Sequence, residues 1–284
     1  MLDLAQISGG LRRGDQGIWE PLAGDPNHQL SFPTGGHAEC LQVEDRSFWF
    51  RHRNACLLET VRRLPPAGAI FELGAGNGFV AAAFEKAGFP CVAVEPGVEG
   101  AHNARSRGVE TVVCSTLEAA SFRRGSLPAV GLFDVVEHIE QDEPFLAEVV
   151  RALAPGGRIY VTVPAYRWLW SDEDRIAGHY RRYTLGRIRA DLARTGLLVE
   201  YATYFFMPLV LPVFLMRTLA GKLRRKAGAP SSRAVEQHQS AEGPFAVAIV
   251  SALELERRWL RRGKRVPIGT SCLVVARKPP APSA

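Results

Sequence analysis

The chain has 284 residues, of which 46% are apolar and 23% are charged, and its formal net charge is +6. Such values are typical of globular proteins and exclude wholesale disorder, and the length suits one large domain. The positive charge gathers late in the chain, in two basic clusters at 222–226 and 257–265. Clusters of this kind attract lipid phosphate, nucleic acid or an acidic substrate, or form an ordinary solvated helix face.

The first third of the chain contains an irregular segment and a helical one. Residues 1–40 are rich in Gly, Pro, Asp and Asn without a sustained period, which predicts an N-terminal arm. From Glu39 to Leu64 the apolar spacing predicts a helix that ends at Pro65. Its candidate buried residues are Phe48, Trp49, Ala55, Leu58 and Val61.

Strands and helices then alternate. Strands are predicted at 69–73, 91–94, 111–113, up to 132 and at 158–163, with helices ending near 86, beginning near 98 and covering 143–153. Two further strands are predicted at 198–204 and 271–276. This order predicts a doubly wound α/β fold with a mostly parallel, seven-stranded sheet.

An insertion precedes the last strand. The core is therefore expected over 41–204, an apolar and basic helical insertion over 205–265, and the last strand with a C-terminal tail over 266–284. Within the insertion, residues 245–260 have an amphipathic helical pattern. The composition of 227–243 predicts a mobile linker.

A glycine turn joins the first predicted strand of this series to its helix. Its sequence is Glu72-Leu-Gly74-Ala-Gly76-Asn-Gly78. Glycines allow a tight turn and let a ligand approach the main-chain amides. A dinucleotide-binding turn has the form GxGxxG, but position 79 is Phe79, which disfavours a nicotinamide-dependent dehydrogenase. An acid, Glu95, follows the next strand, where a carboxylate can accept hydrogen bonds from ribose hydroxyls.

The E-x-G-x-G-x-G turn, together with Glu95 and the following strands, resembles the class I S-adenosylmethionine-dependent methyltransferase family. The resemblance covers roughly 48–204 and the last strand, and it implies a Rossmann-like methyltransferase fold with S-adenosyl-L-methionine as the cofactor. It also implies where the cofactor binds. The expected contacts are the loop residues Glu72, Gly74, Ala75, Gly76, Asn77 and Gly78, the ribose-binding Glu95 and Pro96, the adenine-binding Ser115, Thr116 and Leu117, and Phe133, Asp134, Val135 and His138 beside the methyl group.

Two segments resemble a bacterial subgroup of this family. They are Phe48-Trp-Phe-Arg-His-Arg-Asn54 and Gly178-His-Tyr-Arg-Arg-Tyr-Thr184. By this resemblance the first segment, with Trp49 and Arg53, covers the methionine end of the cofactor, and Arg53 pairs with its carboxylate. The subgroup is associated with natural-product and cell-surface methylation, which leaves the acceptor open.

The chain departs from the family pattern at two positions. Most relatives have an Asp where Ser115 stands, so adenine is expected to be held mainly by backbone and apolar contacts. The usual Phe-Asp at the start of the fourth strand is replaced by Leu127-Pro128, and proline is tolerated at a strand start.

Candidate catalytic residues lie after the fourth and fifth strands. Methyl transfer requires alignment of the acceptor and exclusion of water, and a base only where the acceptor arrives protonated. His138 is either such a base or a structural histidine that caps a turn. The candidates after the fifth strand are His179, Tyr180, Arg181, Arg182 and Tyr183, with Trp168 and Trp170 as a wall. The alternative for this segment is a loop held by ion pairs to Asp172, Glu173 or Asp174.

Function and location follow as expectations. We expect methyl transfer to a small-molecule or lipid-linked acceptor at oxygen. The alternatives are a cofactor-binding scaffold without turnover and a nucleic-acid methyltransferase, although no Asn/Asp-Pro-Pro-aromatic motif is present and no nucleic acid is expected as a partner. The apolar residues 201–216 and the basic cluster after them predict a membrane-surface segment, a roof over the acceptor or a homodimer contact.

The five cysteines and the N-terminus indicate a reducing compartment. Cys40, Cys56, Cys91, Cys114 and Cys272 form no CxxC pair and have no metal-ligand spacing, so no metal site is expected. The first residues lack the apolar core of a signal peptide, and 205–216 is too short to span a bilayer. A cytoplasmic protein is therefore expected, with peripheral contact to the inner membrane as a variant.

Overall fold

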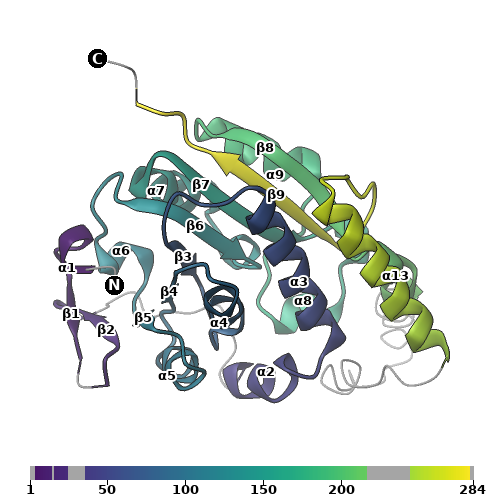
Figure 1. Cartoon of the computed structure of the whole chain (residues 1–284), viewed down its shortest axis with the longest axis horizontal. Coiled ribbons are helices and arrows are strands. Elements are labelled where there is room, and N and C mark those ends of the chain that lie inside the picture. The colour runs from purple at the N-terminus through teal and green to yellow at the C-terminus, as the bar shows by residue number, and fades with distance from the viewer. Residues whose placement is uncertain (1–3, 15, 25–35, 216–243, 282–284) are drawn as a thin grey trace.

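A nine-stranded sheet forms the centre of the molecule (Figure 1). The computed structural model describes residues 4–14, 16–24, 36–215 and 244–281. The strand order is β1-β2-β5-β4-β3-β6-β7-β9-β8, parallel from β2 to β7 and antiparallel where β9 pairs with β7 and β8. The strands are β1 (Leu11–Arg13), β2 (Trp19–Pro21), β3 (Ile70–Leu73), β4 (Cys91–Val94), β5 (Thr111–Val113), β6 (Leu127–Phe133), β7 (Leu153–Pro164), β8 (Leu198–Phe205) and β9 (Ser271–Arg277).

The expectation of seven strands was wrong, because residues 11–21 of the predicted arm add two more. β1 and β2 form an antiparallel pair, and Trp19 of β2 pairs in parallel with Val113 at the edge of the sheet. Leu11 and Ile18 are buried against the domain. Strands of three residues are too short to show an alternating pattern, so their pairing depends on the tertiary structure.

Helices cover both faces of the sheet. The α-helices are α1 (Leu4–Ile7), α2 (Gly36–Glu44), α3 (Phe48–Arg63), α4 (Phe79–Lys86), α5 (Val98–Ser106), α6 (Leu117–Ala120), α7 (Asp142–Ala152), α8 (Asp172–Ile176), α9 (Leu185–Arg194), α10 (Val210–Val213) and α13 (Pro244–Arg261). Three short 3₁₀ helices are η1 (Val136–His138), η2 (Arg167–Leu169) and η3 (Met207–Leu209).

Two hydrophobic clusters lie on opposite faces of the sheet. Successive side chains of a strand point to opposite faces, and in β3 Ile70 belongs to one cluster and Phe71 to the other. One cluster packs the sheet against α6, α7 and α9, and the other packs it against α3, α4, α5 and α13. The parallel strands β3 and β4 are therefore buried throughout, as strands covered on both faces must be.

The helix predicted over 39–64 is two helices. α3 begins after Ser47, whose hydroxyl accepts a hydrogen bond from the Trp49 amide at 3.2 Å and so satisfies one of the free donors of the first turn. Of the predicted buried residues only Val61 is fully buried, while Trp49 and Leu58 are half-buried. Cys56 and Leu57 form the buried face instead.

A proline replaces the usual residue near the start of β6 without loss of the strand. The pairing of β6 with β7 shifts register between Leu127 and Ala129, so Pro128 lies at the irregularity, where no ladder hydrogen bond is required of it. The expected strand is therefore present.

The insertion before β9 is described in part. Its helix α13 packs beside α3 (Figure 1), and no helix among the described residues is long and apolar enough to cross a membrane. The predicted linker 227–243 and the first basic cluster, at 222–226, lie outside the described residues.

Candidate active site

The glycine loop between β3 and α4 requires glycine at two positions because of packing. Gly74 and Gly78 both have φ of 71°. A Cβ on Gly74 would lie 2.8 Å from a methyl of Val135, and one on Gly78 would lie 2.7 Å from the Cβ of Ala104. These glycines therefore let the loop approach the end of β6 and helix α5.

Gly76 differs, because it borders open space. Its φ is 54°, and no heavy atom lies within 4 Å of the position that a Cβ would occupy. Packing therefore does not explain a glycine here. Its positive φ does, and the open space beside the loop leaves room for a ligand to approach the main chain closely.

Glu95 lies beside this loop at the end of β4. Its side chain is buried, and its two oxygens accept hydrogen bonds from the amides of Gly76 and Gly97, each at 2.7 Å. Burial raises the pKa of Glu95, and the two amides oppose this rise. A carboxylate has about four acceptor sites, so Glu95 retains capacity for two ribose hydroxyls.

Glu72 at the end of β3 offers a further acceptor. Among the described residues, its Oε2 is buried and accepts no hydrogen bond. Burial raises the pKa of Glu72 to about 8, with the positive charge of Arg53 acting in the opposite direction. A cationic donor that entered the site would satisfy this oxygen.

The first turns of α3 lie over the loop. The Arg53 guanidinium packs against the rings of Trp49 and Phe50, at 5.1 and 5.3 Å, and donates to Asp134 Oδ2 at 2.7 Å. Trp49 stacks on Phe206, with the ring centroids 5.2 Å apart. The structure thus brings Trp49, Arg53 and Asp134 together, whereas the sequence had led us to expect Arg53 to pair with the cofactor carboxylate.

Several other expected cofactor residues have side chains that are engaged within the protein. The Asn77 amide bonds to the His37 carbonyl and to Asn103, at 2.9 Å each, so it fixes the loop to α2 and α5. The buried Ser115 hydroxyl donates to the Thr116 carbonyl at 2.8 Å, and the Phe133 ring packs against Phe84 in the core.

The remaining residues expected to contact the cofactor lie at strand ends. Thr116 accepts from Ala119 at 3.1 Å and begins α6, in which Leu117 is the first residue. Pro96 follows Glu95 directly, and Val135 packs over Gly74. The buried Ala75 donates its amide to the Val94 carbonyl at 3.2 Å, which closes the loop onto β4.

Sequence reasoning missed the cover that α2 forms. His37 Nε2 lies 3.8 Å from Glu95 Oε1. Arg107, which follows α5 directly, bonds to Glu44 at 2.7 Å, and thereby fixes α2 over the loop. The helix predicted from Glu39 included Glu44, but only the tertiary structure brings Glu44 and Arg107 together, so the sequence contained no signal for the position of α2 over the loop.

Beyond Asp134, the ends of β6 and β7 carry a group of titratable residues. Glu137 and His138 belong to η1, and His179 comes from the loop after α8. Burial lowers the pKa of His138 to about 4. The charge of His179 also lowers it, whereas the charge of Asp134 acts in the opposite direction. Burial, reinforced by Asp134, raises the pKa of Glu137 well above its usual range.

The His179 ring is held by a carboxylate. Its Nδ1 lies 2.9 Å from Asp174 Oδ1, and its Nε2 lies 4.0 Å from Glu137 Oε1. Burial tends to raise the pKa of Asp174, but the hydrogen bond to His179 and the charge of Arg182 lower it to about 2. Asp174 therefore remains ionised and orients the ring.

Three of the predicted catalytic residues instead hold this loop in place. Arg182 bonds to Asp174 at 2.7 Å, and Arg181 pairs with Asp142 at 2.7 Å. The Tyr183 hydroxyl donates to Asp142 at 2.9 Å, and its ring is fully buried. Arg182 thus forms one of the ion pairs of the alternative interpretation, whereas Arg181 and Tyr183 contact Asp142, which was not among the expected partners. The side chain of Tyr180 is 48% exposed, at the rim.

The aromatic wall expected from Trp168 and Trp170 is present in part. Trp168 stacks on Tyr166, with the ring centroids 5.3 Å apart, and contacts Phe214 edge-on. Tyr166 in turn stacks on Tyr204 of β8. Trp168 is 45% exposed, so this stack borders the molecular surface next to the apolar insertion.

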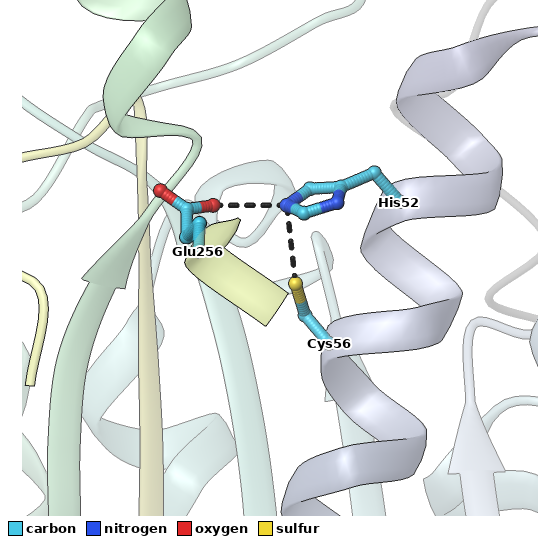
Figure 2. A group of neighbouring side chains, drawn as sticks. All are labelled: His52, Cys56 and Glu256. Carbon is cyan, nitrogen blue, oxygen red and sulfur yellow. Dashed lines mark hydrogen bonds and ion pairs between the residues drawn. The ribbon is translucent and has the colours of Figure 1, made fainter. Parts of the chain in front are cut away.

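A second titratable cluster joins α3 to α13 (Figure 2). His52 Nε2 lies 2.9 Å from Glu256 Oε1 and 3.2 Å from Cys56 Sγ. The Glu256 carboxylate also accepts the amides of Phe206 and Met207, each at 2.7 Å. Burial raises the pKa of Cys56 well above its usual range, which keeps it a thiol. Because its hydrogen bonds are satisfied internally, this cluster fastens α13 and the end of β8 to α3.

Residues 71–161 match a family model described as a methyltransferase domain. The match spans the glycine loop, Glu95 and the end of β6, where the open site lies. This protein is a methyltransferase. The predictions of an S-adenosylmethionine-dependent enzyme and of S-adenosylmethionine as its cofactor are confirmed, and three features of the methyltransferase fit that cofactor: the open space at Gly76, the free acceptor sites of Glu95 and the unsatisfied Oε2 of Glu72.

Solved structures agree on the fold. A chain of the Haloferax volcanii complex that contains the Trm112 methyltransferase activator has a TM-score of 0.56 at 15% identity, with coverage of 88% of the methyltransferase and 97% of that chain. An S-adenosylmethionine-dependent methyltransferase from Thermotoga maritima has a TM-score of 0.51 at 18% identity, with coverage of 86% and 99%.

A longer protein has the same fold. Haemonchus contortus phosphoethanolamine N-methyltransferase 2, solved with S-adenosyl-L-methionine, has a TM-score of 0.52 at 16% identity. The alignment covers 87% of the methyltransferase but only 57% of that longer chain. At these identities the likeness establishes the fold alone. No curated protein matches the sequence.

Proposed function

We propose that the methyltransferase transfers a methyl group to a hydroxyl of a small-molecule or lipid-linked acceptor. The observation that carries this proposal is the pair formed by Asp174 of α8 and His179 in the loop after it, 2.9 Å apart. His179 also lies 4.0 Å from Glu137, and its ring contacts that of His138. A hydroxyl arrives protonated, so its methylation benefits from a base at the acceptor edge. An oriented histidine suits that role.

The cofactor, when bound, supplies an electrophilic methyl group on sulfur. In the proposed arrangement, Glu95 accepts the ribose hydroxyls with the acceptor sites left by the Gly76 and Gly97 amides. Glu72 Oε2 accepts the cofactor's amino group, and Arg53 donates to its carboxylate while it remains bonded to Asp134. Gly76 allows the close approach of the main chain that this requires.

At the acceptor edge, His179 accepts the hydroxyl proton and Asp174 stabilises the charged ring. The pKa of about 4 makes His138 a weak base at neutral pH, so we assign it a positioning role. Arg181, Arg182 and Tyr183 hold the loop that carries His179. Trp49 and the α3 segment exclude water from the methionine end of the site.

The subgroup resemblance is part of the proposal. Its two characteristic segments supply Arg53, which is proposed to hold the cofactor, and His179, which is proposed to act on the acceptor. We further propose a bacterial, cytoplasmic enzyme with a peripheral membrane contact near η3 and α10. In support of that contact, Leu211 and Leu215 are 63% and 46% exposed. Flotation with anionic liposomes tests it, and complete recovery in the soluble fraction contradicts it.

The proposed binding mode is tested by isothermal titration with S-adenosylmethionine and S-adenosylhomocysteine. Glu95→Ala should abolish micromolar binding, whereas Glu99→Ala on the exposed start of α5 should leave it unchanged. Screening of acceptors with labelled methyl donor then separates an enzyme that methylates hydroxyls from one that acts on amines, on nucleic acid or on no acceptor. Equal binding by wild type and Glu95→Ala would refute the proposed ribose contact.

A further inference from the structure

Glu137 is a fully buried carboxylate without the hydrogen bonds that such a group requires. Its residue exposure is 0%, and among the described residues neither carboxylate oxygen accepts a hydrogen bond from another residue. Burial of a carboxylate costs several kcal/mol unless donors or a cation compensate for the lost water. The other buried carboxylate at the acceptor edge, Asp174, has such partners in His179 and Arg182.

Two imidazoles flank this carboxylate. The rings of His138 and His179 meet edge to face, with their centroids 4.7 Å apart. One ligand atom from each of Glu137, His138 and His179 can be chosen so that all three lie within 4.8 Å of one another. Around a tetrahedral metal with bonds of about 2.0–2.2 Å, ligand atoms are about 3.4 Å apart, so a shift of about an ångström by each side chain would suffice.

The surrounding contacts orient these ligands. Asp174 bonds to Nδ1 of His179 at 2.9 Å, which directs Nε2 toward Glu137. Metal-binding histidines commonly have such a carboxylate on the second ring nitrogen. The backbone of the two segments is also joined, because the Tyr180 amide donates to the Glu137 carbonyl at 2.8 Å. The spacing of the three groups is therefore fixed by the fold.

We propose that Glu137, His138 and His179 bind a divalent first-row transition-metal cation at the acceptor edge of the sheet. Two imidazoles and one carboxylate favour zinc and its neighbours in the first row over magnesium and calcium, which prefer oxygen ligands. Three protein ligands leave coordination positions open, as in catalytic zinc sites. The scattered cysteines had led to the expectation of no metal site, and this site uses none of them.

The second titratable cluster of the molecule is a poor metal site by comparison (Figure 2). In it the Glu256 oxygens already accept hydrogen bonds from His52 and from two backbone amides. The third member, Cys56, is a buried thiol rather than a thiolate. This cluster provides a control, because it has the same number of candidate ligands and is more fully buried.

The role of the cation rests on the proposed function, whereas its binding does not. Its open positions would face the edge where the acceptor is proposed to lie, so it would bind the acceptor hydroxyl next to Asp134 and lower the pKa of that hydroxyl. With the cation bound, both ring nitrogens of His179 are engaged, by the cation and by Asp174, so His179 acts as the base only in the metal-free protein. Metal binding and cofactor binding are measured in separate titrations. A negative result for the metal therefore leaves the proposed function to be tested by cofactor binding, and a negative result for the cofactor leaves the metal site to be tested by metal binding.

The test uses full-length, tag-free protein treated with a chelator and then titrated with Zn²⁺ by calorimetry and with Co²⁺ by visible absorption. We expect one Zn²⁺ per chain and a cobalt spectrum of nitrogen and oxygen ligation. Glu137→Gln and His179→Asn should each weaken Zn²⁺ binding at least about tenfold, and Asp174→Asn about tenfold to a hundredfold. Cys56→Ser in the control cluster should leave the affinity unchanged.

Three results would overturn the proposal: no saturable Zn²⁺ binding by the wild type, wild-type affinity in both Glu137→Gln and His179→Asn, or a thiolate-to-cobalt band that Cys56→Ser removes. Thermal unfolding of each variant shows whether it is folded. Glu137 and His179 lie on different segments, so misfolding of one variant leaves the other to decide the question.

Discussion

Arg53 of α3 and Asp134 at the end of β6 form an ion pair with Nη1 and Oδ2 2.7 Å apart, across 81 positions of sequence. Asp134 has a left-handed φ of 59°, which a non-glycine residue adopts only where its surroundings impose it. The pair joins the helix that covers the cofactor site to the strand end that borders the acceptor, and both side chains are largely buried.

This pair predicts that a lysine cannot replace Arg53. A guanidinium can bond to Asp134 and to the cofactor carboxylate at once, whereas an ammonium is a point charge on a flexible stem. Arg53→Lys should weaken S-adenosylmethionine binding by about 1.5–3 kcal/mol, or roughly tenfold to a hundredfold, as measured by calorimetry. Arg62→Lys, at a position whose side chain is 53% exposed, is the matched control. Equal affinity of the two variants would contradict the assignment.

A pair of glycines separates backbone strain from ligand contact. Gly76 and Gly88 both have positive φ, and open space surrounds both Cβ positions. Alanine at either site should cost about 1–2 kcal/mol of the free energy of unfolding. Only Gly76→Ala should also weaken cofactor binding, by tenfold or more, because its methyl group would project toward the ligand. Urea unfolding and calorimetry on both variants measure the two effects, and unimpaired binding by Gly76→Ala would show that the cofactor lies elsewhere.

The raised pKa of Glu72 predicts how stability depends on pH. Burial raises this pKa from 4.5 to about 8, so the neutral acid is favoured in the folded state. Its favourable contribution is complete below about pH 4.5, and it is lost as the pH rises toward 8. Unfolding measured at intervals from pH 5 to 8 should show this decline in the wild type and a flatter profile in Glu72→Gln.

The same group predicts pH-dependent cofactor binding. The ammonium group of the cofactor binds the ionised carboxylate, so cofactor binding should release a proton from Glu72. The affinity should therefore rise by up to tenfold for each unit by which the pH is raised, until the pH reaches about 8. Calorimetry in buffers of different ionisation enthalpy measures the released proton. Glu72→Gln should release none at this site, and identical proton release in the two proteins would rule out Glu72 as the amino-group partner.

Replacement of Glu256 in α13 should lower the free energy of unfolding more than replacement of an exposed glutamate of the same helix. Its carboxylate serves His52 and two backbone amides, and Glu256→Gln would leave at least one of these without a good acceptor. We expect a loss of about 1–3 kcal/mol in the free energy of unfolding. Glu254→Gln, two residues earlier and 39% exposed, should cost less than about 1 kcal/mol. Equal losses in urea unfolding would contradict the role of Glu256 as a clamp.

Sequence reasoning worked best where structure is determined locally. Apolar runs and helix breakers predicted the glycine turn and the strands at 91–94 and 111–113, and the structure has them. The same signals predicted one helix that ends near Lys86 and another that begins near Val98, which are α4 and α5. It failed for the three-residue strands β1 and β2, which have too few residues to show a period. It also missed the break at Ser47, whose cap depends on a single hydroxyl.

Local patterns in the sequence determined the glycine loop and the position of Glu95 after its strand, and the resemblance that these residues carry implied an S-adenosylmethionine-dependent methyltransferase. Tertiary structure alone decided which polar side chains are satisfied. It pairs Asp174 with His179 and Arg182, and it pairs Arg181 and Tyr183 with Asp142. Within the described part of the chain, it leaves the buried Glu137 carboxylate without a hydrogen bond from another residue. The reason is that hydrogen bonding and burial depend on residues far apart in the chain, whereas turns and amphipathic periods depend on neighbours.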